Sequence, residues 1–215
     1  MSCQTFAIAT TLSVLALGSP LISSCMSFTR INTNPLRDGS FNSGVEKSDQ
    51  GNYQGAIADF SRAIEINAQD DDAYYNRGVV KEKLKNYQGA IADYSKAIEI
   101  NPQNALAYSN RGYIKLKLND HQGSIVDCSK AIEIDAQLVV AYLNCGYSKL
   151  NLNDRPGALT DYNKAIEINP QNALAYRNRG LLKELTGDLN GACRDWRKAV
   201  NFGSTEPAEW VNQKC

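Results

Sequence analysis

The sequence predicts an all-α protein built as a solenoid of stacked helix–turn–helix units. Two segments recur along the chain at one common interval. The first has the form AYxNxG, and its copies start 34 residues apart, at Ala73, Ala107, Ala141 and Ala175. The second, YQGAIADYSKAIEIN in its clearest copy from Tyr87, returns with the same period. A 34-residue period is the signature of a helix–turn–helix array, in which neighbouring units complete one another's core.

The composition excludes some classes of partner. The chain has 215 residues, and its 23 Lys and Arg are balanced by 23 Asp and Glu. With this balance, no net charge draws the protein to nucleic acid or to an acidic bilayer, so we expect no nucleic-acid partner. Hydrophobic residues make up 43% of the chain, which suits a folded protein rather than a disordered one.

Residues 1–24 resemble a secretory signal peptide. Residues 6–17 form a mostly apolar run, which is shorter than the roughly 20 residues that a transmembrane helix needs. The segment departs from a standard signal because no Lys or Arg precedes Arg30. The ISSC sequence that ends at Cys25 resembles the lipobox of bacterial lipoproteins. We therefore expect Cys25 to carry the lipid anchor and residues 25–36 to form a polar tether.

Three interpretations of this leader stay open at the level of the sequence. The first is an exported protein held at a bacterial membrane by the Cys25 lipid, with no other membrane attachment. The second is secretion without a lipid. The third takes Met26 as the start of translation, which would place the protein in the cytoplasm.

The array extends over residues 37–206. Aligning its recurrent glycines divides it into five units, which span residues 37–70, 71–104, 105–138, 139–172 and 173–206. Before each second helix stands a residue whose side-chain oxygen can cap free backbone amides, namely Asn52, Asn86, Asp120, Asp154 and Asp188. Helices this short are marginal alone in water, so stacking has to supply the core. Residues 207–215, with Trp210, are predicted to form a capping helix over the last pair.

Further positions recur within the units. Four units have an aromatic residue at the fourth position, whereas the first unit has Ser40 there. The eighth position is Gly, positions 20 and 27 are small, and position 24 is a large ring in most units. This pattern closely resembles the tetratricopeptide repeat (TPR) family across residues 37–206. The resemblance implies a right-handed α-solenoid whose first helices line a concave groove.

The sequence offers no catalytic site. Its one His, His121, lies in a predicted turn without a cluster of Cys or carboxylates, so we expect neither a metal nor a cofactor. The resemblance implies a non-enzymatic scaffold that binds a protein or peptide segment in the groove. The alternative function is a structural assembly factor that docks folded partners by its outer face or self-associates. The partner and the oligomeric state are not fixed by the sequence.

Two groups of residues are predicted to contact a bound peptide. The first is a ladder of amides at the sixth position, which can donate to and accept from a peptide backbone: Asn76, Asn110, Asn144 and Asn178. The second is a set of apolar side chains centred on units three and four: Tyr113, Tyr147, Leu116, Leu143 and Leu150. The alternative is that the amides bond only within the stack and that the apolar residues pack onto one another.

Charged residues recur as well. Arg77, Arg111 and Arg179 stand at the seventh position, and Asp recurs at the twenty-third. We predict a ladder of Arg–Asp pairs across adjoining helices, which would fix register more than it adds stability. Independent, solvated charges are the alternative.

Four of the six Cys are predicted to form disulfides. Cys128 replaces the expected ring in unit three, and Cys145 replaces the expected Arg in unit four, on helices that should be neighbours. Cys193 begins the last second helix, and Cys215 ends the capping helix. We predict the pairs Cys128–Cys145 and Cys193–Cys215, one of three connectivities open to four Cys. The second pair also resembles a terminal pattern of exported bacterial TPR proteins, and buried free thiols are the alternative for both.

Overall fold

A computed structural model describes residues 39–215, and it confirms the all-α solenoid, with eleven helices and no strand in this part of the chain. The first helices of the five units are α1 (Gly39–Asp49), α3 (Asp71–Lys83), α5 (Ala105–Lys117), α7 (Val139–Asn151) and α9 (Ala173–Leu185). The second helices are α2 (Tyr53–Ile66), α4 (Tyr87–Ile100), α6 (His121–Ile134), α8 (Arg155–Ile168) and α10 (Leu189–Asn201). A last helix, α11, spans Pro207–Lys214.

The features predicted for the leader lie outside the described residues. These are the signal peptide at 1–24, the lipid anchor at Cys25, the tether at 25–36 and the alternative start at Met26. Among the helices of residues 39–215, none combines the length and the hydrophobicity that a membrane span requires.

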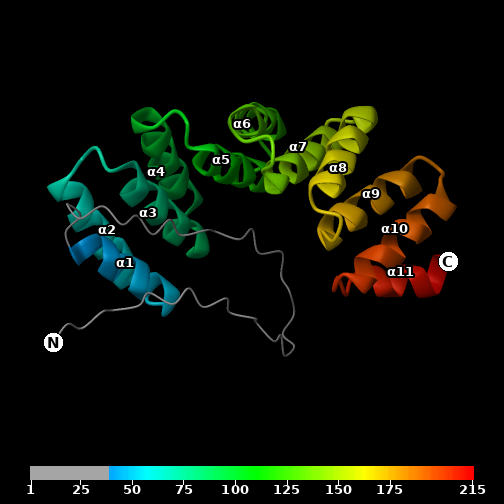
Figure 1. The fold of residues 1–215 in the computed structure, drawn as a ribbon, viewed down its shortest axis with the longest axis horizontal. Helices are drawn as coiled ribbons and strands as arrows, with labels where there is room; N and C mark the ends of the chain where they lie inside the picture. The colour runs from blue at the N-terminus through cyan, green and yellow to red at the C-terminus, as the bar shows by residue number, and fades with distance from the viewer. Residues whose placement is uncertain (1–38) are drawn as a thin grey trace, which may run out of the picture.

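The helix pairs stack into an arch (Figure 1). Each helix packs against its partner in the unit and against the adjoining unit. The odd-numbered helices also touch one another in succession, and no comparable row of contacts joins the even-numbered helices in the described part of the chain. Helices on the inside of a curve lie closer together than those on the outside. We therefore call α1, α3, α5, α7 and α9 the inner helices, and their partners α2, α4, α6, α8 and α10 the outer helices.

The predicted N-caps are present. At every outer helix the Asn or Asp side chain before the first turn accepts a hydrogen bond from the backbone amide of a Gly three residues later. In α8, for example, Asp154 accepts from Gly157 at 2.9 Å. The second helices therefore begin where the sequence places them, and Pro156 lies in the first turn of α8, where a missing amide costs little.

In every unit except the third, an aromatic ring of the outer helix lies over the glycine of the inner helix. A Cβ atom built on Gly78 would lie 2.8 Å from the Tyr94 ring, so only glycine permits this approach of α3 and α4. In the first unit, Phe41 stands at the fifth position, like Tyr75 in the second unit, and it packs on Phe60 as Tyr75 packs on Tyr94. The Phe41 side chain is fully buried and packs edge-on against Phe60, with ring centroids 5.6 Å apart.

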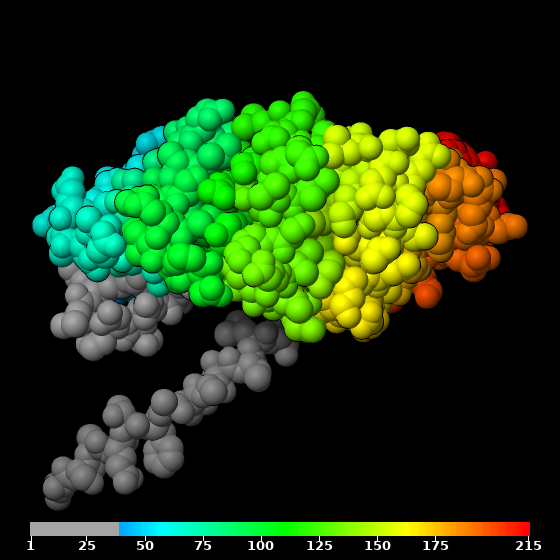
Figure 2. Space-filling model, turned by 90° about the horizontal axis from the view of Figure 1, so that it is seen from above, coloured from blue at the N-terminus to red at the C-terminus, as the bar shows by residue number. Residues whose placement is uncertain are grey.

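Figure 2 shows the arch from its outer side, where the successive units form one continuous surface along the length of the molecule. This surface belongs mainly to the outer helices. The opposite side, lined by the inner helices, carries the residues that the sequence predicts as peptide contacts.

Candidate functional site

The four predicted asparagines lie on the inner helices, and their side chains are nearly fully buried. Asn110 donates to the Tyr75 hydroxyl of the preceding inner helix at 3.1 Å, and Asn144 donates to the backbone carbonyl of Ser109 at 3.2 Å. Asn76 donates to the Asp72 carbonyl in its own helix, and Asn178 accepts from Arg177. The bonds of Asn110 and Asn144 join successive units, whereas those of Asn76 and Asn178 stay within their own helices. All four amides are therefore engaged within the stack. Their contact with a peptide stays a prediction.

The five predicted apolar residues separate into two groups. Leu143 is 7% exposed and belongs to the core cluster that includes Tyr142 and Tyr162, so it packs inward. The other four lie at the surface of the inner helices to differing extents, and Tyr147 is the most open, with 43% of its surface exposed. We call these four residues the inner apolar patch: Tyr113, Leu116, Tyr147 and Leu150.

A lysine lies among the tyrosines of this patch. The Lys117 ammonium group is 5.1 Å from the centroid of the Tyr113 ring. Its pKa is raised, first by a hydrogen bond with Tyr113 and further by interaction with Tyr87 and Tyr147. The tyrosines of successive inner helices therefore lie close enough to act on one cation.

The side of the patch toward unit two is more polar. There Glu82 occupies the position that is Leu150 in unit four, and it accepts a hydrogen bond from the Tyr94 hydroxyl at 2.9 Å. Burial raises the pKa of Glu82. In unit four the equivalent ring, Tyr162, belongs to the core cluster against which Leu150 packs, and its buried hydroxyl has no hydrogen-bond partner. The inner face thus changes from polar to apolar between units two and four.

The predicted ladder of Arg–Asp pairs is confirmed. Arg111 donates to both carboxylate oxygens of Asp127, at 2.9 and 2.7 Å, and Asp127 is 1% exposed. The same bidentate geometry joins Arg77 to Asp93 and Arg179 to Asp195. Such geometry gives the stronger class of ion pair. The alternative of independent, solvated charges is therefore excluded for these three pairs.

Sequence reasoning missed a lysine that pairs with the recurrent Asp of every unit, as a second cation at Asp93, Asp127 and Asp195. A Lys four residues after the arginine position lies within 2.8 Å of the same carboxylate, as Lys115 does at Asp127. The equivalent residues are Lys47, Lys81, Lys149 and Lys183. The signal was present in the sequence, because Lys recurs at the eleventh position of every unit.

Unit four interrupts the ladder. Cys145 occupies its arginine position and is bonded to Cys128 on α6, with the two Cα atoms 5.6 Å apart. Asp161 consequently pairs with Lys149 alone, at 2.8 Å. Burial raises the pKa of Asp161. At Asp195, by contrast, burial acts in the same direction, but hydrogen bonds from Arg179 and Lys183 leave its pKa below the ordinary value.

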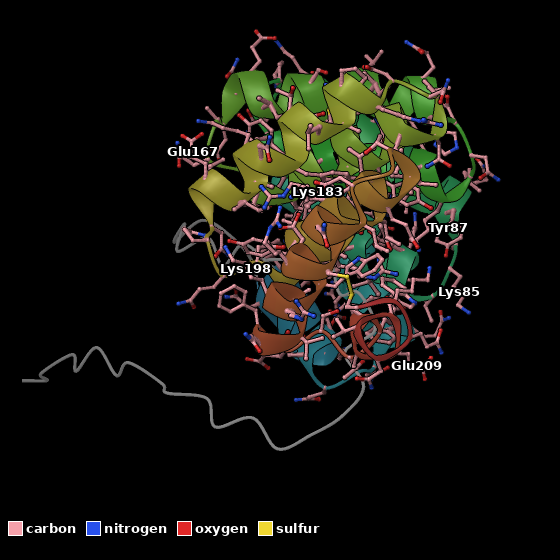
Figure 3. All side chains as sticks on the ribbon, turned by 90° about the vertical axis from the view of Figure 1, so that its right-hand side faces the viewer. Lys85, Tyr87, Glu167, Lys183, Lys198 and Glu209 are labelled. Atoms are coloured by element: carbon pink, nitrogen blue, oxygen red, sulfur yellow. A yellow bond between two sulfur atoms is a disulfide. The ribbon has the colours of Figure 1, made fainter. Side chains whose placement is uncertain are left out.

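The C-terminal end of the arch is closed by α11, which packs against α10. Cys193 and Cys215 lie at disulfide-bond distance, with Cα atoms 5.7 Å apart, and Figure 3 shows this bond in yellow near α11, which is seen end-on. The ring of Trp210 packs edge-on against Trp196, with centroids 5.4 Å apart. Both predicted cysteine pairings are thus the ones the structure contains.

Ion pairs also join α11 to the last inner helix. Arg177 of α9 is 2.5 Å from Glu206, directly before α11, and Lys214 of α11 pairs with Glu184 of α9. Trp210 stands 34 residues after Tyr176, so α11 continues the register of the repeat. The capping helix therefore takes the place of a sixth inner helix.

Two other features could suggest a small ligand. The carboxylates of Asp70, Asp71 and Asp72 lie within 4.8 Å of one another. However, Asp70 caps α3 by accepting from Ala73, and Asp71 accepts from the amides of Asn101 and Asn104, so these groups serve the junction between units.

A cavity of about 150 Å³ lies between α10 and α11, lined by residues such as Arg197, Val200 and Val211. Pockets that hold small molecules usually measure about 300–1,000 Å³. Neither feature therefore points to a cofactor.

Comparison with known families identifies the repeat. A model described as tetratricopeptide repeat matches residues 71–104, and a second model with the same description matches residues 94–125. A third, described as TPR repeat, matches residues 46–85 and 151–187. No curated protein matches the sequence.

Solved structures show the same fold at low sequence identity. A crystal structure of MamA shares 22% identity with a TM-score of 0.68, and the match covers 77% of this chain and 96% of MamA. YrrB, whose structure is described as a TPR protein with an unusual peptide-binding site, shares 20% identity, with a TM-score of 0.67 and coverage of 82% and 92%. PilW, a type IV pilus biogenesis factor, shares 21% identity, with a TM-score of 0.72 and coverage of 80% of each chain.

Proposed function

Since the chain carries tetratricopeptide repeats over residues 46–125 and 151–187, we propose that it is a non-catalytic scaffold that binds a polypeptide segment along the inner face of the arch. Repeats of this kind form extended concave surfaces that suit elongated partners. The peptide-binding site named for YrrB, a protein of the same fold, supports the proposal.

One observation carries this proposal more than any other. Tyr147 is 43% exposed on an inner helix, although the fourth-position tyrosine five residues earlier, Tyr142, is only 8% exposed in the same helix. A large aromatic side chain left open beside Leu150 and Tyr113 forms an apolar patch with polar neighbours. Such patches commonly mark surfaces that bind other proteins, and tyrosine is enriched among residues that dominate binding energy.

We further propose that the protein is exported and anchored through a lipid on Cys25. The lipobox-like sequence before Cys25 supports this location. The two cysteine pairs at bonding distance add support, because disulfides persist mainly in oxidising compartments. Intact-mass analysis of the native protein tests the proposal, since it reports cleavage before Cys25, added lipid and bridged cysteines together. A full-length, unmodified, reduced chain would overturn it.

A second function rests on the outer helices. Val126 on α6 is 61% exposed and Leu159 on α8 is 36% exposed, so apolar side chains also remain open there. These residues would serve a structural assembly factor that docks folded partners or a second copy through its outer face.

One experiment separates the two functions. Peptides would be selected from a random displayed library on the wild-type protein, and their affinities measured by fluorescence anisotropy for Tyr147→Ala/Leu150→Ala and for Val126→Ala. We expect the inner-face variant to lose about 2 kcal/mol, or roughly 30-fold in affinity, and the outer-face variant to bind normally. Failure to select any peptide, or loss only in Val126→Ala, would contradict binding at the inner face.

A further inference from the structure

The inner apolar patch repeats with a fixed step. Tyr113 and Tyr147 occupy the same position in consecutive units, and so do Leu116 and Leu150. Their helices, α5 and α7, are in direct contact, and so are α7 and α9. Axes of packed helices are about 8–10 Å apart. The patch therefore offers two short apolar rows whose members recur at that spacing along the arch.

A spacing of about 8–10 Å between equivalent side chains favours some conformations of a bound segment over others. In a polyproline II helix the rise is about 3.1 Å per residue with three residues per turn, so every third side chain lies on one face about 9.3 Å from the last. In a β-strand, side chains alternate between faces, so residues three apart point in opposite directions. An α-helix reaches the step only after about seven residues, or roughly 10.5 Å.

The chemistry of the patch favours the same conformation. A polyproline II backbone has no internal hydrogen bonds, so its carbonyl groups need donors on the receptor surface. Tyr147 offers an exposed aromatic ring with a hydroxyl group, beside the Lys117 ammonium group. Aromatic-lined grooves are the common receptors for such segments, whereas an α-helix satisfies its own backbone.

The charges of the inner face indicate which end of the segment is acidic. Lys83 and Lys117 occupy the same position in units two and three, where units four and five have Asn151 and Leu185. Both lysines interact electrostatically with Glu82, whose carboxylate already accepts a hydrogen bond from the Tyr94 hydroxyl. Lys83 and Lys117 thus share the single carboxylate of Glu82, which is already hydrogen-bonded. This end of the patch therefore complements a partner with negative charge.

We propose that the partner is a polyproline II segment with an apolar side chain at every third residue and an acidic residue at the end that lies over units two and three. The assignment rests on the proposed binding at the inner face and gives that binding a register and a direction.

Synthetic peptides test this assignment. The probe is a fluorescein-labelled peptide of three Leu-Pro-Pro triplets flanked by two Glu, made with the acidic pair at either end. One control peptide has the same composition in scrambled order, and another is an alanine-rich helix with leucines seven residues apart. Anisotropy titrations would use the wild type, Tyr147→Ala, Lys117→Ala and, as a matched outer-face control, Val126→Ala.

We expect one triplet peptide to bind at least about ten-fold tighter than its scrambled control. Tyr147→Ala should remove this preference, Lys117→Ala should weaken binding and reduce its salt dependence, and Val126→Ala should change neither. If the helical or scrambled peptide binds as well as the triplet peptide but still depends on Tyr147, the polyproline assignment is wrong and inner-face binding stands. If no peptide of any kind binds, both are overturned.

Discussion

Arg111 donates hydrogen bonds to both carboxylate oxygens of Asp127. The third nitrogen of its guanidinium group donates to the Ser95 hydroxyl of the preceding unit at 3.0 Å. One guanidinium group therefore ties three helices together, α4, α5 and α6. Arg77 makes the equivalent bond to Ser61, and Arg179 to Asn163. The ladder thus connects units as well as the two helices within each unit.

Replacing one arginine of the ladder tests its contribution to stability. In Arg111→Leu, Asp127 stays 1% exposed with Lys115 as its remaining cation. Because Lys115 still compensates the charge, removing the arginine should cost about 1–3 kcal/mol, and we expect urea denaturation to show that loss. The double variant Arg111→Leu/Asp127→Leu should recover most of it, because apolar residues can replace a buried pair. An unchanged midpoint for Arg111→Leu would mean that the pairs do not stabilise the fold.

Unit four has Cys145 where units two, three and five have the arginine of the ladder. We therefore predict that the contributions of Asp161 and Asp195 to stability depend on pH in opposite ways. The pKa of Asp195 is lowered, so its charge stabilises the fold above the ordinary pKa of 3.8 and this stability is lost as the pH falls through the lowered value. The pKa of Asp161 is raised, so its charge is unfavourable at neutral pH, and that penalty disappears as the pH falls toward 3.8.

Asparagine substitutions at the two positions should reveal this difference. At pH 7 we expect Asp195→Asn to lower the free energy of unfolding and Asp161→Asn to leave it unchanged or to raise it. At about pH 3 the effect of Asp195→Asn should shrink. The free energy of unfolding would be measured by chemical denaturation. If both variants lost the same amount at pH 7, the replacement of arginine by Cys145 would not alter the ion pair of unit four.

The disulfide between units three and four should stabilise the middle of the arch. Cys128 and Cys145 are 17 residues apart in sequence, and closing a loop of that size contributes about 3 kcal/mol. Cys128→Ser/Cys145→Ser should therefore lower the unfolding free energy by that order. Hydrogen exchange should rise in α6 and α7 while α10 and α11 keep their protection. The matched variant Cys193→Ser/Cys215→Ser should produce the opposite distribution.

Two glycines at the same position should differ in their tolerance of a methyl group. A Cβ on Gly146 would lie 2.7 Å from the fully buried Tyr162 ring, and overpacking of this kind costs about 1–3 kcal/mol. At Gly112 the ring is replaced by Cys128, and the nearest atom would be 3.2 Å away. We expect Gly146→Ala to lower the melting temperature clearly and Gly112→Ala to lower it less. Equal shifts would show that the ring does not set the spacing of the helices.

The repeat made much of the fold predictable from the sequence. Once one unit is aligned, the helix caps, the Arg–Asp pairs and the cysteine exceptions fall at equivalent positions, because each unit has the same neighbours. Trp210 could also have been assigned to a sixth inner helix, since it follows Tyr176 by one full period. Phe41 was missed as a core residue because its position, the fifth of the unit, varies along the chain, from Phe41 and Tyr75 to Arg177.

The candidate site was less predictable. A sequence pattern places Asn144 on an inner helix but does not show whether its amide is already bonded, as it is to Ser109. Leu143 and Tyr147 both belong to the varying positions of one helix, yet the first is buried and the second is open. Exposure depends on the small rotation and spacing between units, which is a property of the stack and not of one repeat.

The closure of the arch by α11 affects how such a chain can change in length. A duplicated unit inserted anywhere upstream would meet the same two neighbouring surfaces and leave the sealed terminus unaltered. A unit placed directly after α10 would instead compete with α11 for the surface of α10. An additional unit would therefore be accommodated inside the array, and it would lengthen the inner face by one helix.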